Sequence, residues 1–312
     1  MAEHTDNGGK IAILGCGKLG IAILQGLAKS YSKNSHNLGH VVVTAKTSAG
    51  AKRIQKSING FATTQDSLRV EIHTGDENSL AVQDAVVVIL GCKPNALSEI
   101  LTPKVVRAIE QNEKRTILVN LAGGVTLVDL ARMYRSVRGG QEHRAFIVRA
   151  IPNIAASVRQ SATVLSSWTE DGREAVQRVF DLIGHTEWVA EEQMFAASAL
   201  GASSLAFHAI ILRAVAGSLS EMSSADAIRL CARAMLGTAA LVLAGESPDA
   251  IIDKVATRGG STEAGLHILK THGVEDSFLA AIRATTQATG TMGKTVSRLS
   301  DQPGGADVRC AE

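Results

Sequence analysis

The sequence predicts an α/β doubly wound sheet followed by an all-α C-terminal domain. The first half alternates short Val/Ile/Leu runs with helical stretches, a pattern typical of a mainly parallel sheet covered by helices on both faces. After Glu191 no convincing strand follows, and apolar residues recur at helical spacing. The 312 residues also exceed the length, roughly 250 to 300, at which one core usually splits. We therefore expect two domains, residues 1–190 and 191–298, and a flexible tail, residues 299–312.

Eight segments of the first domain are predicted as strands. Most are continuous apolar runs, as expected of strands that are buried on both faces. The last two are candidate edge strands, separated by an amphipathic helix over Asp171–Ile183 that Gly184 would end. In chain order the predicted strands are Ile11–Leu14, His40–Ala45, Arg69–His73, Ala85–Leu90, Thr116–Leu121, Ala145–Ala150, Ser161–Ser166 and Thr186–Val189.

The sequence contains capping residues that predict where the helices of the second domain begin and end. The apolar spacing over Ile228–Leu243 predicts one helix, and Gly245 suits its C-terminus. Ser247 and Pro248 suit the N-cap and first turn of the next helix. Gly273 is expected to end a further helix. These signals predict a helical domain joined by short turns.

Composition and charge exclude several function classes. The net charge is +2, with 32 basic and 30 acidic residues spread along the chain, which gives no footprint for nucleic acid or an anionic membrane. The 4 cysteines lie far apart, which fits a reducing compartment and predicts no metal site. The apolar stretch Ala199–Leu219 contains His208 and Arg213 and predicts a buried helix rather than a membrane span. The first ten residues lack the apolar core of a secretory signal. A cytoplasmic protein with a small-molecule ligand is the expectation.

A glycine-rich loop follows the first predicted strand. Its three glycines have the spacing Gly-x-Gly-x-x-Gly and open a helix. The first suits a tight turn, the second lets backbone approach a pyrophosphate, and the third lets the helix pack closely on the strand. The phosphates would lie at a helix N-terminus, which favours anions. The pattern predicts a Rossmann-type dinucleotide site, and a merely structural turn is the alternative. The predicted cofactor contacts are Gly15, Cys16, Gly17, Lys18, Leu19 and Gly20.

The end of the second strand distinguishes NADP(H) from NAD(H). An acidic side chain there would bind the ribose 2′-hydroxyl of NAD(H) and repel a 2′-phosphate. This chain instead has Lys46, Thr47 and Ser48, with Lys52 and Arg53 on the following helix. A cation and two hydroxyls suit a 2′-phosphate, so Lys46 and Thr47 are predicted contacts. We expect NADPH, with NADH as the alternative; the competing interpretation of Lys46 is a solvated side chain.

Five segments of the chain match a known family. The segments are Ile13–Gly20, Cys92–Pro94, Leu121–Val125, Arg149–Asn153 and Asp253–Thr262. Together they resemble the pyrroline-5-carboxylate reductases, NAD(P)H-dependent enzymes that make proline, and the resemblance runs over about residues 10–294. It implies hydride transfer to the C=N carbon of a five-membered cyclic imine that bears a carboxylate. It also implies a helical C-terminal domain that dimerises, often within larger rings.

The resemblance implies that the segment around Thr262 binds the substrate. Thr257 matches a carboxylate contact, and Thr262 matches a hydrogen-bond partner of the imine nitrogen, which makes Thr262 the predicted catalytic residue. Two glycines before a helix start are expected to offer unobstructed N–H groups to a carboxylate. The alternative is that Ser261 or Thr262 simply caps the helix. The predicted substrate-binding residues are Thr257, Arg258, Gly259, Gly260 and Ser261.

Other matched positions imply cofactor contacts after three further strands. One group matches the adenosine side of the cofactor, a second borders the nicotinamide and its ribose, and a third lies at the carboxyl end of a strand, the usual ligand edge of such sheets. These groups are Lys93, Pro94 and Asn95, then Ala122 and Gly123, and finally Asn153.

Three departures from the family pattern lie near the expected substrate. Family members commonly have Ser-Gly-Ser-Gly-Pro-Ala-Tyr at Gly201–Phe207, Thr-Pro at Ile154–Ala155, and proline at Arg258. A guanidinium beside the carboxylate pocket would suit a second acidic group; a solvent-facing Arg258 is the alternative. The expected substrate is a small cyclic imino acid, either 1-pyrroline-5-carboxylate or a different cyclic imine of a specialised pathway.

Two other function classes compete with an imine reductase. A hydroxyacid dehydrogenase also joins a dinucleotide domain to a helical one, and it would need a lysine base such as Lys254 or Lys270. A non-catalytic NADP(H)-binding sensor follows if the altered segment Gly201–Phe207 abolished the chemistry. Binding of cofactor without reduction of any imine would favour the sensor. We expect the chain to act as a homodimer or larger homo-oligomer.

Overall fold

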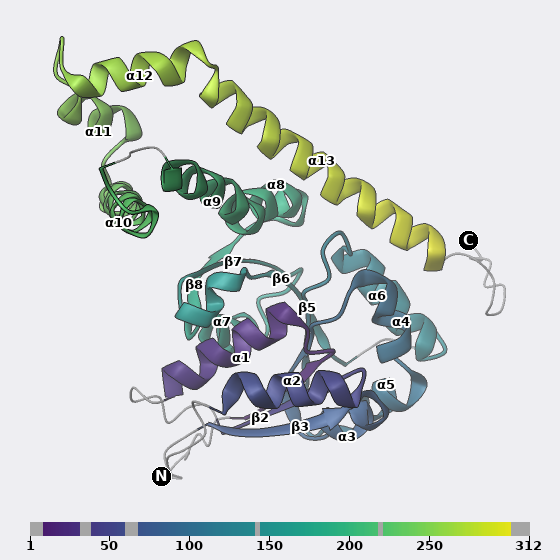
Figure 1. Cartoon of the computed structure of the whole chain (residues 1–312). Helices are drawn as coiled ribbons and strands as arrows, with labels where there is room; N and C mark the ends of the chain where they lie inside the picture. The colour runs from purple at the N-terminus through teal and green to yellow at the C-terminus, as the bar shows by residue number, and fades with distance from the viewer. Residues whose placement is uncertain (1–8, 32–38, 60–67, 141–143, 218–220, 301–312) are drawn as a thin grey trace, which may run out of the picture. The chain divides into compact units, whose positions relative to one another are not determined.

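The chain divides into two units, each described by itself. The computed structural model describes residues 9–31, 39–59, 68–140, 144–217 and 221–300 (Figure 1). One unit comprises residues 1–202 with 286–312, and the other comprises residues 203–285.

The first unit contains an eight-stranded sheet with the strand order β3-β2-β1-β4-β5-β6-β7-β8. All neighbours pair in parallel except β6 and β7. The order reverses at β1, so the sheet is doubly wound as predicted. All eight predicted strands are present. Of the two candidate edge strands, β8 forms an edge and β7 lies inside the sheet; the other edge is β3. The strands are β1 (Lys10–Leu14), β2 (His40–Ala45), β3 (Arg69–Thr74), β4 (Ala85–Leu90), β5 (Ile117–Asn120), β6 (Phe146–Ile151), β7 (Ser161–Ser166) and β8 (Gly184–Trp188).

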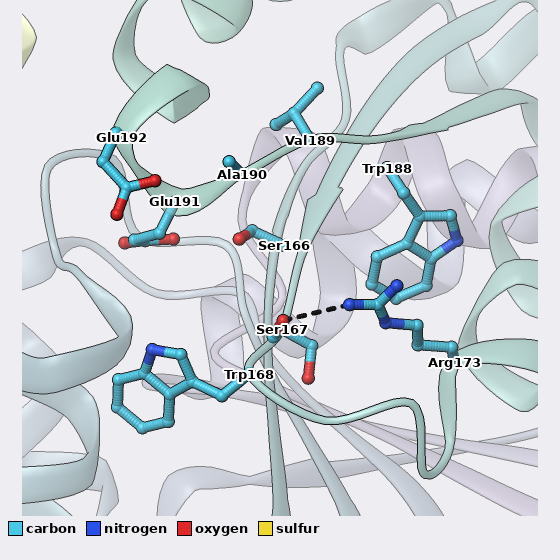
Figure 2. Close-up of a pocket in the computed structure, with 9 residues that line it drawn as sticks. All are labelled: Ser166, Ser167, Trp168, Arg173, Trp188, Val189, Ala190, Glu191 and Glu192. Atoms are coloured by element: carbon cyan, nitrogen blue, oxygen red, sulfur yellow. Dashed lines mark hydrogen bonds between the residues drawn. The ribbon is translucent and has the colours of Figure 1, made fainter.

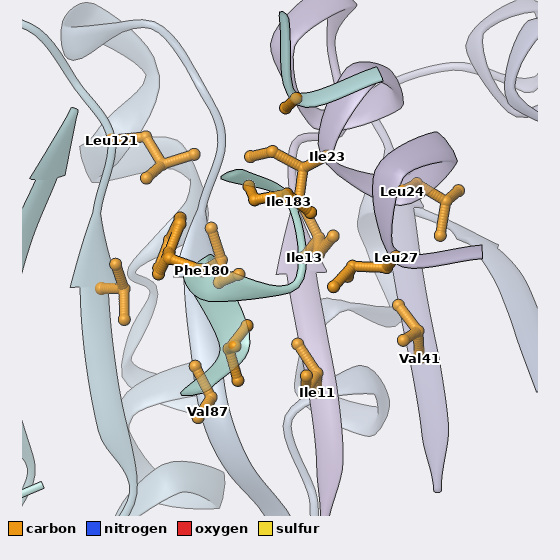
Figure 3. Packing of buried hydrophobic residues seen from close by; sticks show 14 of the residues in the cluster. Ile11, Ile13, Ile23, Leu24, Leu27, Val41, Val87, Leu121, Phe180 and Ile183 are labelled. Carbon is orange, nitrogen blue, oxygen red and sulfur yellow. The ribbon is translucent and has the colours of Figure 1, made fainter. Parts of the chain in front are cut away.

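Helices cover both faces of this sheet because alternate strand residues point to opposite sides. Ile11 and Ile13 of β1 pack with Leu27 and Phe180 on one face (Figure 3), whereas Leu14 belongs to the core of the other. The first face is covered by α1 (Lys18–Tyr31), α2 (Ser48–Ile58) and α7 (Arg173–Asp181). The second face is covered by α3 (Asn78–Ala81), α4 (Leu97–Ile100), α5 (Pro103–Gln111) and α6 (Leu127–Val137).

Gly184 begins β8, so its assignment to the end of a helix is wrong. The preceding helix α7 ends at Asp181, earlier than the expected Asp171–Ile183. Gly184 lies opposite Ser161 in the parallel β7–β8 pair, where a Cβ would collide with the backbone of Ser161. The close approach of two strands, rather than helix termination, therefore requires glycine here.

Replacing Gly184 by alanine is expected to lower the free energy of unfolding by about 1–3 kcal/mol, because one of the two strands must shift. Urea denaturation measures the loss. Gly75→Ala is the matched control, since a Cβ there would lie 3.7 Å from the nearest atom, an ordinary contact. It should change stability by about 0.5 kcal/mol or less. Equal losses in the two variants would contradict the collision at Ser161.

The remaining elements are helices, and no strand follows β8 in the described part of the chain. Their ends match the sequence signals: the Ser247 hydroxyl accepts from Ala250 N–H, Pro248 is the first helical residue, and Gly245 and Gly273 have positive φ. The last helix continues through Ser300, and residues 301–312 of the expected tail lie outside the described residues. The helices are α8 (Met194–Ser198), α9 (Ser204–Ala214), α10 (Ser224–Leu243), α11 (Pro248–Val255), α12 (Ser261–Thr271) and α13 (Val274–Ser300).

The apolar helices that follow β8 are largely exposed in the single chain. A buried helix was expected at Ala199–Leu219, but Ser204 is the one buried residue of α9, and Ile210 is 54% exposed. That expectation is wrong for α9 in the isolated chain, because most of its side chains are exposed; residues 218–219 of the stretch lie outside the described residues. By length and composition, the stretch Glu191–Gly217 is also apolar enough to cross a membrane. Apolar periodicity alone does not distinguish a core from an interface.

Candidate active site

The glycine-rich loop joins β1 to α1 and is held by the end of β2. Gly15 has φ +72°, a conformation that favours glycine, and a Cβ there would lie 2.9 Å from Cβ of Cys92. Gly15 N–H donates to Oγ1 of Thr44 at 3.2 Å, and Cys16 N–H donates to the Thr44 carbonyl at 2.7 Å. The tight turn expected at the first glycine is present.

The second and third glycines differ in their surroundings as the motif requires. A Cβ at Gly20 would lie 2.9 Å from Sγ of Cys16, so the helix packs closely on the loop. At Gly17 the nearest atom would be 4.0 Å away, which leaves room for a ligand. The N–H groups of Lys18, Leu19 and Gly20 donate to no acceptor within the described residues. This cradle fits the pyrophosphate of a dinucleotide.

The two cysteines near the loop are packing groups rather than nucleophiles. Burial raises the pKa of Cys16 to about 12, although the charge of Arg53 opposes the shift. Burial also raises the pKa of Cys92 to about 11. Both thiols are therefore neutral near pH 7, and their contribution here is to fill space around the glycines.

The residues after β2 are already engaged with other groups. Oγ1 of Thr47 accepts from Gly50 N–H at 3.1 Å and caps α2. Nζ of Lys46 lies 2.7 Å from Oε2 of Glu99, a residue of α4. The sequence did not indicate this ion pair, because nothing in the local pattern connects the two residues. Both side chains remain largely exposed.

The turn after β5 is organised by a buried asparagine that sequence reasoning missed. Ala122 N–H donates to Oδ1 of Asn120 at 2.9 Å, and Nδ2 of Asn120 donates to the Val125 carbonyl at 3.1 Å. Gly124 has φ +83°, as the third residue of a type II turn requires. An amide residue near the end of an apolar strand was the feature of the sequence that could have indicated this role. The two hydrogen bonds of Asn120 fix the backbone of Ala122 and Gly123.

The predicted cofactor residues of the first unit share one edge of the sheet. Strands β1, β2, β4, β5 and β6 run parallel, so the segments that follow them lie at the same edge. Lys93 and Asn95 are exposed around the short 3-10 turn Pro94–Ala96. The residues brought to this edge are Gly15, Cys16, Gly17, Lys18, Leu19, Gly20, Lys46, Thr47, Lys93, Pro94, Asn95, Ala122, Gly123 and Asn153.

Asn153 ties the end of β6 to a later helical segment. Its Oδ1 accepts from Ala155 N–H at 2.9 Å, and its Nδ2 donates to the Gly201 carbonyl at 2.7 Å. Gly201 belongs to a π-helical turn, Ala199–Ser203, within the segment that departs from the family pattern. The side chain is buried and bonded at both ends. Its cofactor contact stays a prediction.

A fully buried arginine lies earlier on the same strand. Nη1 of Arg149 donates to Oε1 of Glu191 at 2.8 Å, and the guanidinium lies 4.9 Å from the ring centroid of Phe195. The same Glu191 oxygen accepts from Leu127 N–H, the first residue of α6. One ion pair therefore joins β6, α6 and the segment that leads into α8. The sequence feature that could have indicated this buried ion pair is a basic residue, Arg149, inside an apolar strand.

A hollow of about 410 Å³ is lined by the end of β7, the end of β8 and the residues that follow them (Figure 2). Because β7 runs antiparallel to β6, the end of β7 lies where the parallel strands begin. Both tryptophans of the chain border it, and the guanidinium of Arg173 lies 4.8 Å from the Trp188 ring. None of the lining residues belongs to the glycine-rich loop. The lining residues are Ser166, Ser167, Trp168, Arg173, Trp188, Val189, Ala190, Glu191 and Glu192.

The predicted substrate residues lie on the second unit, at the start of α12. Gly260 is the N-cap, and no side chain caps the helix, so the interpretation of Ser261 or Thr262 as a cap is wrong. Gly259 has φ +73°, and its N–H donates to Oε2 of Glu263 at 2.6 Å. The sequence indicated no role for the Glu263 side chain.

The N–H groups that are hydrogen-bonded within this loop are not the ones that the sequence predicts. Gly260 N–H donates to the Thr257 carbonyl at 2.9 Å, and Gly259 N–H is taken by Glu263. The expectation of unobstructed N–H groups at both glycines is therefore wrong, because the loop closes on itself. The next two N–H groups, of Ser261 and Thr262, donate to no acceptor in the part of the chain that is described.

The basic residues near this loop have different environments. Arg258 is exposed beside the loop. Lys254, a candidate base of a hydroxyacid dehydrogenase, has its Nζ 2.6 Å from Oε2 of Glu246. Thr257 is exposed, whereas Thr262 is half-buried. The structure thus places the predicted residues in two groups, one on each unit.

Comparisons with known proteins cover nearly the whole chain. Residues 191–292 match the family model described as pyrroline-5-carboxylate reductase dimerisation, and residues 10–124 match the model described as NADP oxidoreductase, coenzyme F420-dependent. A pyrroline-5-carboxylate reductase of Penicillium fellutanum is 31% identical over 91% of this chain and 91% of its own length. Another, of Lophium arboricola, is 32% identical over 95% of this chain and 98% of its own.

A solved structure supports the fold. The pyrroline carboxylate reductase of Plasmodium falciparum, solved with NADP bound, matches with a TM-score of 0.72 and 17% identity. The match covers 92% of this chain and 99% of that one. The chain therefore shares the fold of that protein over most of its length. The chain belongs to the pyrroline-5-carboxylate reductase family, as an NAD(P)-dependent oxidoreductase with an N-terminal NADP-binding domain and a helical C-terminal dimerisation domain.

Proposed function

We propose that this chain reduces a cyclic imine carboxylate with NADPH, with 1-pyrroline-5-carboxylate as the first candidate and proline as its product. The observation that carries the proposal is the start of α12. There, the N–H groups of Ser261 and Thr262 donate to no acceptor among the described residues, and Thr262 adds a half-buried hydroxyl. A helix N-terminus of this kind suits a carboxylate. The family relationship supplies the reaction type.

The cofactor supplies the hydride, and the residues of the sheet edge hold it. The N–H groups of Lys18, Leu19 and Gly20 face the position of a pyrophosphate at the N-terminus of α1. Lys46 and its neighbours provide positive charge for a 2′-phosphate. The turn fixed by Asn120 presents Ala122 and Gly123 as a rigid border for the nicotinamide end.

The substrate needs positioning more than it needs covalent catalysis. A cyclic iminium is already a hydride acceptor, so the protein has to hold the C=N carbon against the nicotinamide. In this proposal Ser261 and Thr262 N–H groups bind the substrate carboxylate, in place of the glycines expected from the sequence. The Thr262 hydroxyl orients the imine nitrogen. Thr257 and Arg258 lie at the same loop and complete the substrate side.

Exposed Arg258 favours a second substrate candidate, a larger or more acidic cyclic imine of a specialised pathway. The test is NADPH consumption with a panel of cyclic imino acids that carry one or two carboxylates. If Arg258 binds a second carboxylate, Arg258→Leu raises KM for dicarboxylic imines about tenfold, the effect of losing one charged hydrogen bond, and leaves monocarboxylic imines unchanged. An equal change for both classes would contradict that role. NADPH binding without turnover on any imine would favour a sensor instead.

The exposed helices support a homo-oligomer. Apolar side chains on the second unit remain in solvent in the single chain, for example Leu230, Leu236 and Ile268, which are 57%, 59% and 56% exposed. Such surfaces mark interfaces in soluble proteins. We propose a homodimer or larger assembly through residues 191–292, and a cytoplasmic location.

A further inference from the structure

The Lys46–Glu99 ion pair crosses the edge of the sheet above the glycine-rich loop. Lys46 follows β2, and Glu99 lies on α4, which follows β4. In the strand order, β1 lies between β2 and β4, and β1 leads directly into the loop. A contact of 2.7 Å between Nζ and Oε2 therefore joins the two sides of the position where β1 delivers the cofactor-binding loop.

This pair places a carboxylate among residues that otherwise suit an anion. On one side are Lys46, Lys52 and Arg53, the cations expected to favour a 2′-phosphate. On the other side Glu99 lies on α4, shortly after Lys93, Pro94 and Asn95, the residues expected on the adenosine side of the cofactor. Glu99 is 57% exposed and Lys46 is 79% exposed, so both side chains are free to change partners. The sequence pattern at the end of β2 did not indicate this negative charge.

We propose that Glu99 is a cofactor-selectivity residue, which holds Lys46 across the adenosine end of the site and competes with the 2′-phosphate of NADPH for it. The inference rests on the proposed use of a nicotinamide dinucleotide. When NADPH binds, Lys46 exchanges the carboxylate of Glu99 for the phosphate. NADH brings no phosphate, so the ion pair between Lys46 and Glu99 stays in place when NADH binds.

The pair is better explained by ligand selection than by folding. Exposed ion pairs contribute little to stability, because solvent screens them and both side chains lose freedom. Loss of Glu99 therefore leaves the fold intact and changes which dinucleotide binds better. The preference for NADPH over NADH should rise in Glu99→Gln, since the competitor for Lys46 is removed while its shape is kept.

The experiment measures dissociation constants of NADPH and NADH for the full chain by calorimetry, without any imine. Glu99→Gln should bind NADPH about threefold to fivefold more tightly, the order of one exposed ion pair, and should bind NADH no better than the wild type. The gain for NADPH should shrink when salt is raised from about 0.05 M to 0.5 M. Glu187→Gln is the control, because Glu187 is an exposed glutamate of β8, at the far end of the strand order from β2.

A second variant tests whether the effect of Glu99 depends on Lys46. Lys46→Gln should weaken NADPH binding, and adding Glu99→Gln to it should bring no further gain. Equal effects on NADPH and NADH, or a gain that persists without Lys46, would overturn the role of Glu99. A wild-type chain that binds neither dinucleotide would refute the proposed cofactor and this assignment with it. Binding of both with an unchanged ratio in Glu99→Gln would refute the assignment alone.

Discussion

Replacing Thr262 by alanine is expected to lower kcat on the order of 100-fold, the usual contribution of a side chain that handles the reacting nitrogen. The dissociation constant of NADPH should stay nearly unchanged, because Thr262 belongs to the substrate group on the second unit. The fold should also be retained, since Gly260 rather than Thr262 caps α12. Steady-state rates with the best imine substrate, together with calorimetric titration of NADPH, measure the two effects.

Two variants control this result. Thr262→Ser keeps a hydroxyl at the same position and should recover most of the rate. Thr271→Ala removes the same atoms at the other end of α12, where the hydroxyl donates to the His267 carbonyl, and should leave kcat nearly intact. Parallel losses of NADPH affinity and turnover in Thr262→Ala would show a structural role instead.

Replacing Arg149 by methionine is expected to lower the free energy of unfolding by about 3–5 kcal/mol. Arg149 is fully buried, and its removal leaves the Glu191 carboxylate, 19% exposed, without its cation. The ring of Phe195 also loses the guanidinium that lies 4.9 Å from its centroid. Urea denaturation followed by circular dichroism measures the loss, at a fixed protein concentration because an oligomer is expected.

The same substitution at an exposed arginine gives the matched control. Arg178 pairs with Glu174 on the surface of α7, and Arg178→Met should cost about 1 kcal/mol or less. Adding Glu191→Gln to Arg149→Met should restore part of the stability, since no uncompensated charge remains. If Arg149→Met lowers the free energy of unfolding no more than Arg178→Met does, the Arg149–Glu191 pair does not stabilise the fold as proposed.

Local patterns were sufficient for the sheet and for several helix ends of the second domain. Buried parallel strands are continuous apolar runs, so His40–Ala45 and Ala85–Leu90 were predicted with the bounds that the structure has. Caps and turns are also local: Ser247, Pro248 and Gly273 act on their own neighbours in the chain. The glycine-rich loop belongs to the same class, because a Cβ at Gly15 or Gly20 would lie 2.9 Å from a neighbouring atom, whereas Gly17 leaves room for a ligand.

Pairs that are distant in the chain could not be predicted from local patterns. Lys46 and Glu99, like Arg149 and Glu191, meet only after the sheet has formed. Gly184 has the appearance of a helix end until β7 is placed beside it.

The predictions for the loop before α12 and for the burial of α9 were wrong for related reasons. The glycine N–H groups before α12 are taken by Glu263 and by the Thr257 carbonyl, a closure that residue types do not reveal. The helix over Ser204–Ala214 has the apolar content of a core helix, but a single chain leaves most of it exposed. Burial depends on what covers a surface, and sequence periodicity reports only that a surface is apolar.

The most direct test of the central claim follows the hydride itself. NADPH that carries deuterium at the transferable position is incubated with the full chain and 1-pyrroline-5-carboxylate, and the product is analysed by mass spectrometry and NMR. The proposed function predicts proline with one deuterium at the former imine carbon, and Thr262→Ala should form it far more slowly. NADPH binding with no deuterium transferred to this imine, or to any other cyclic imino acid of the panel, would contradict a reductase.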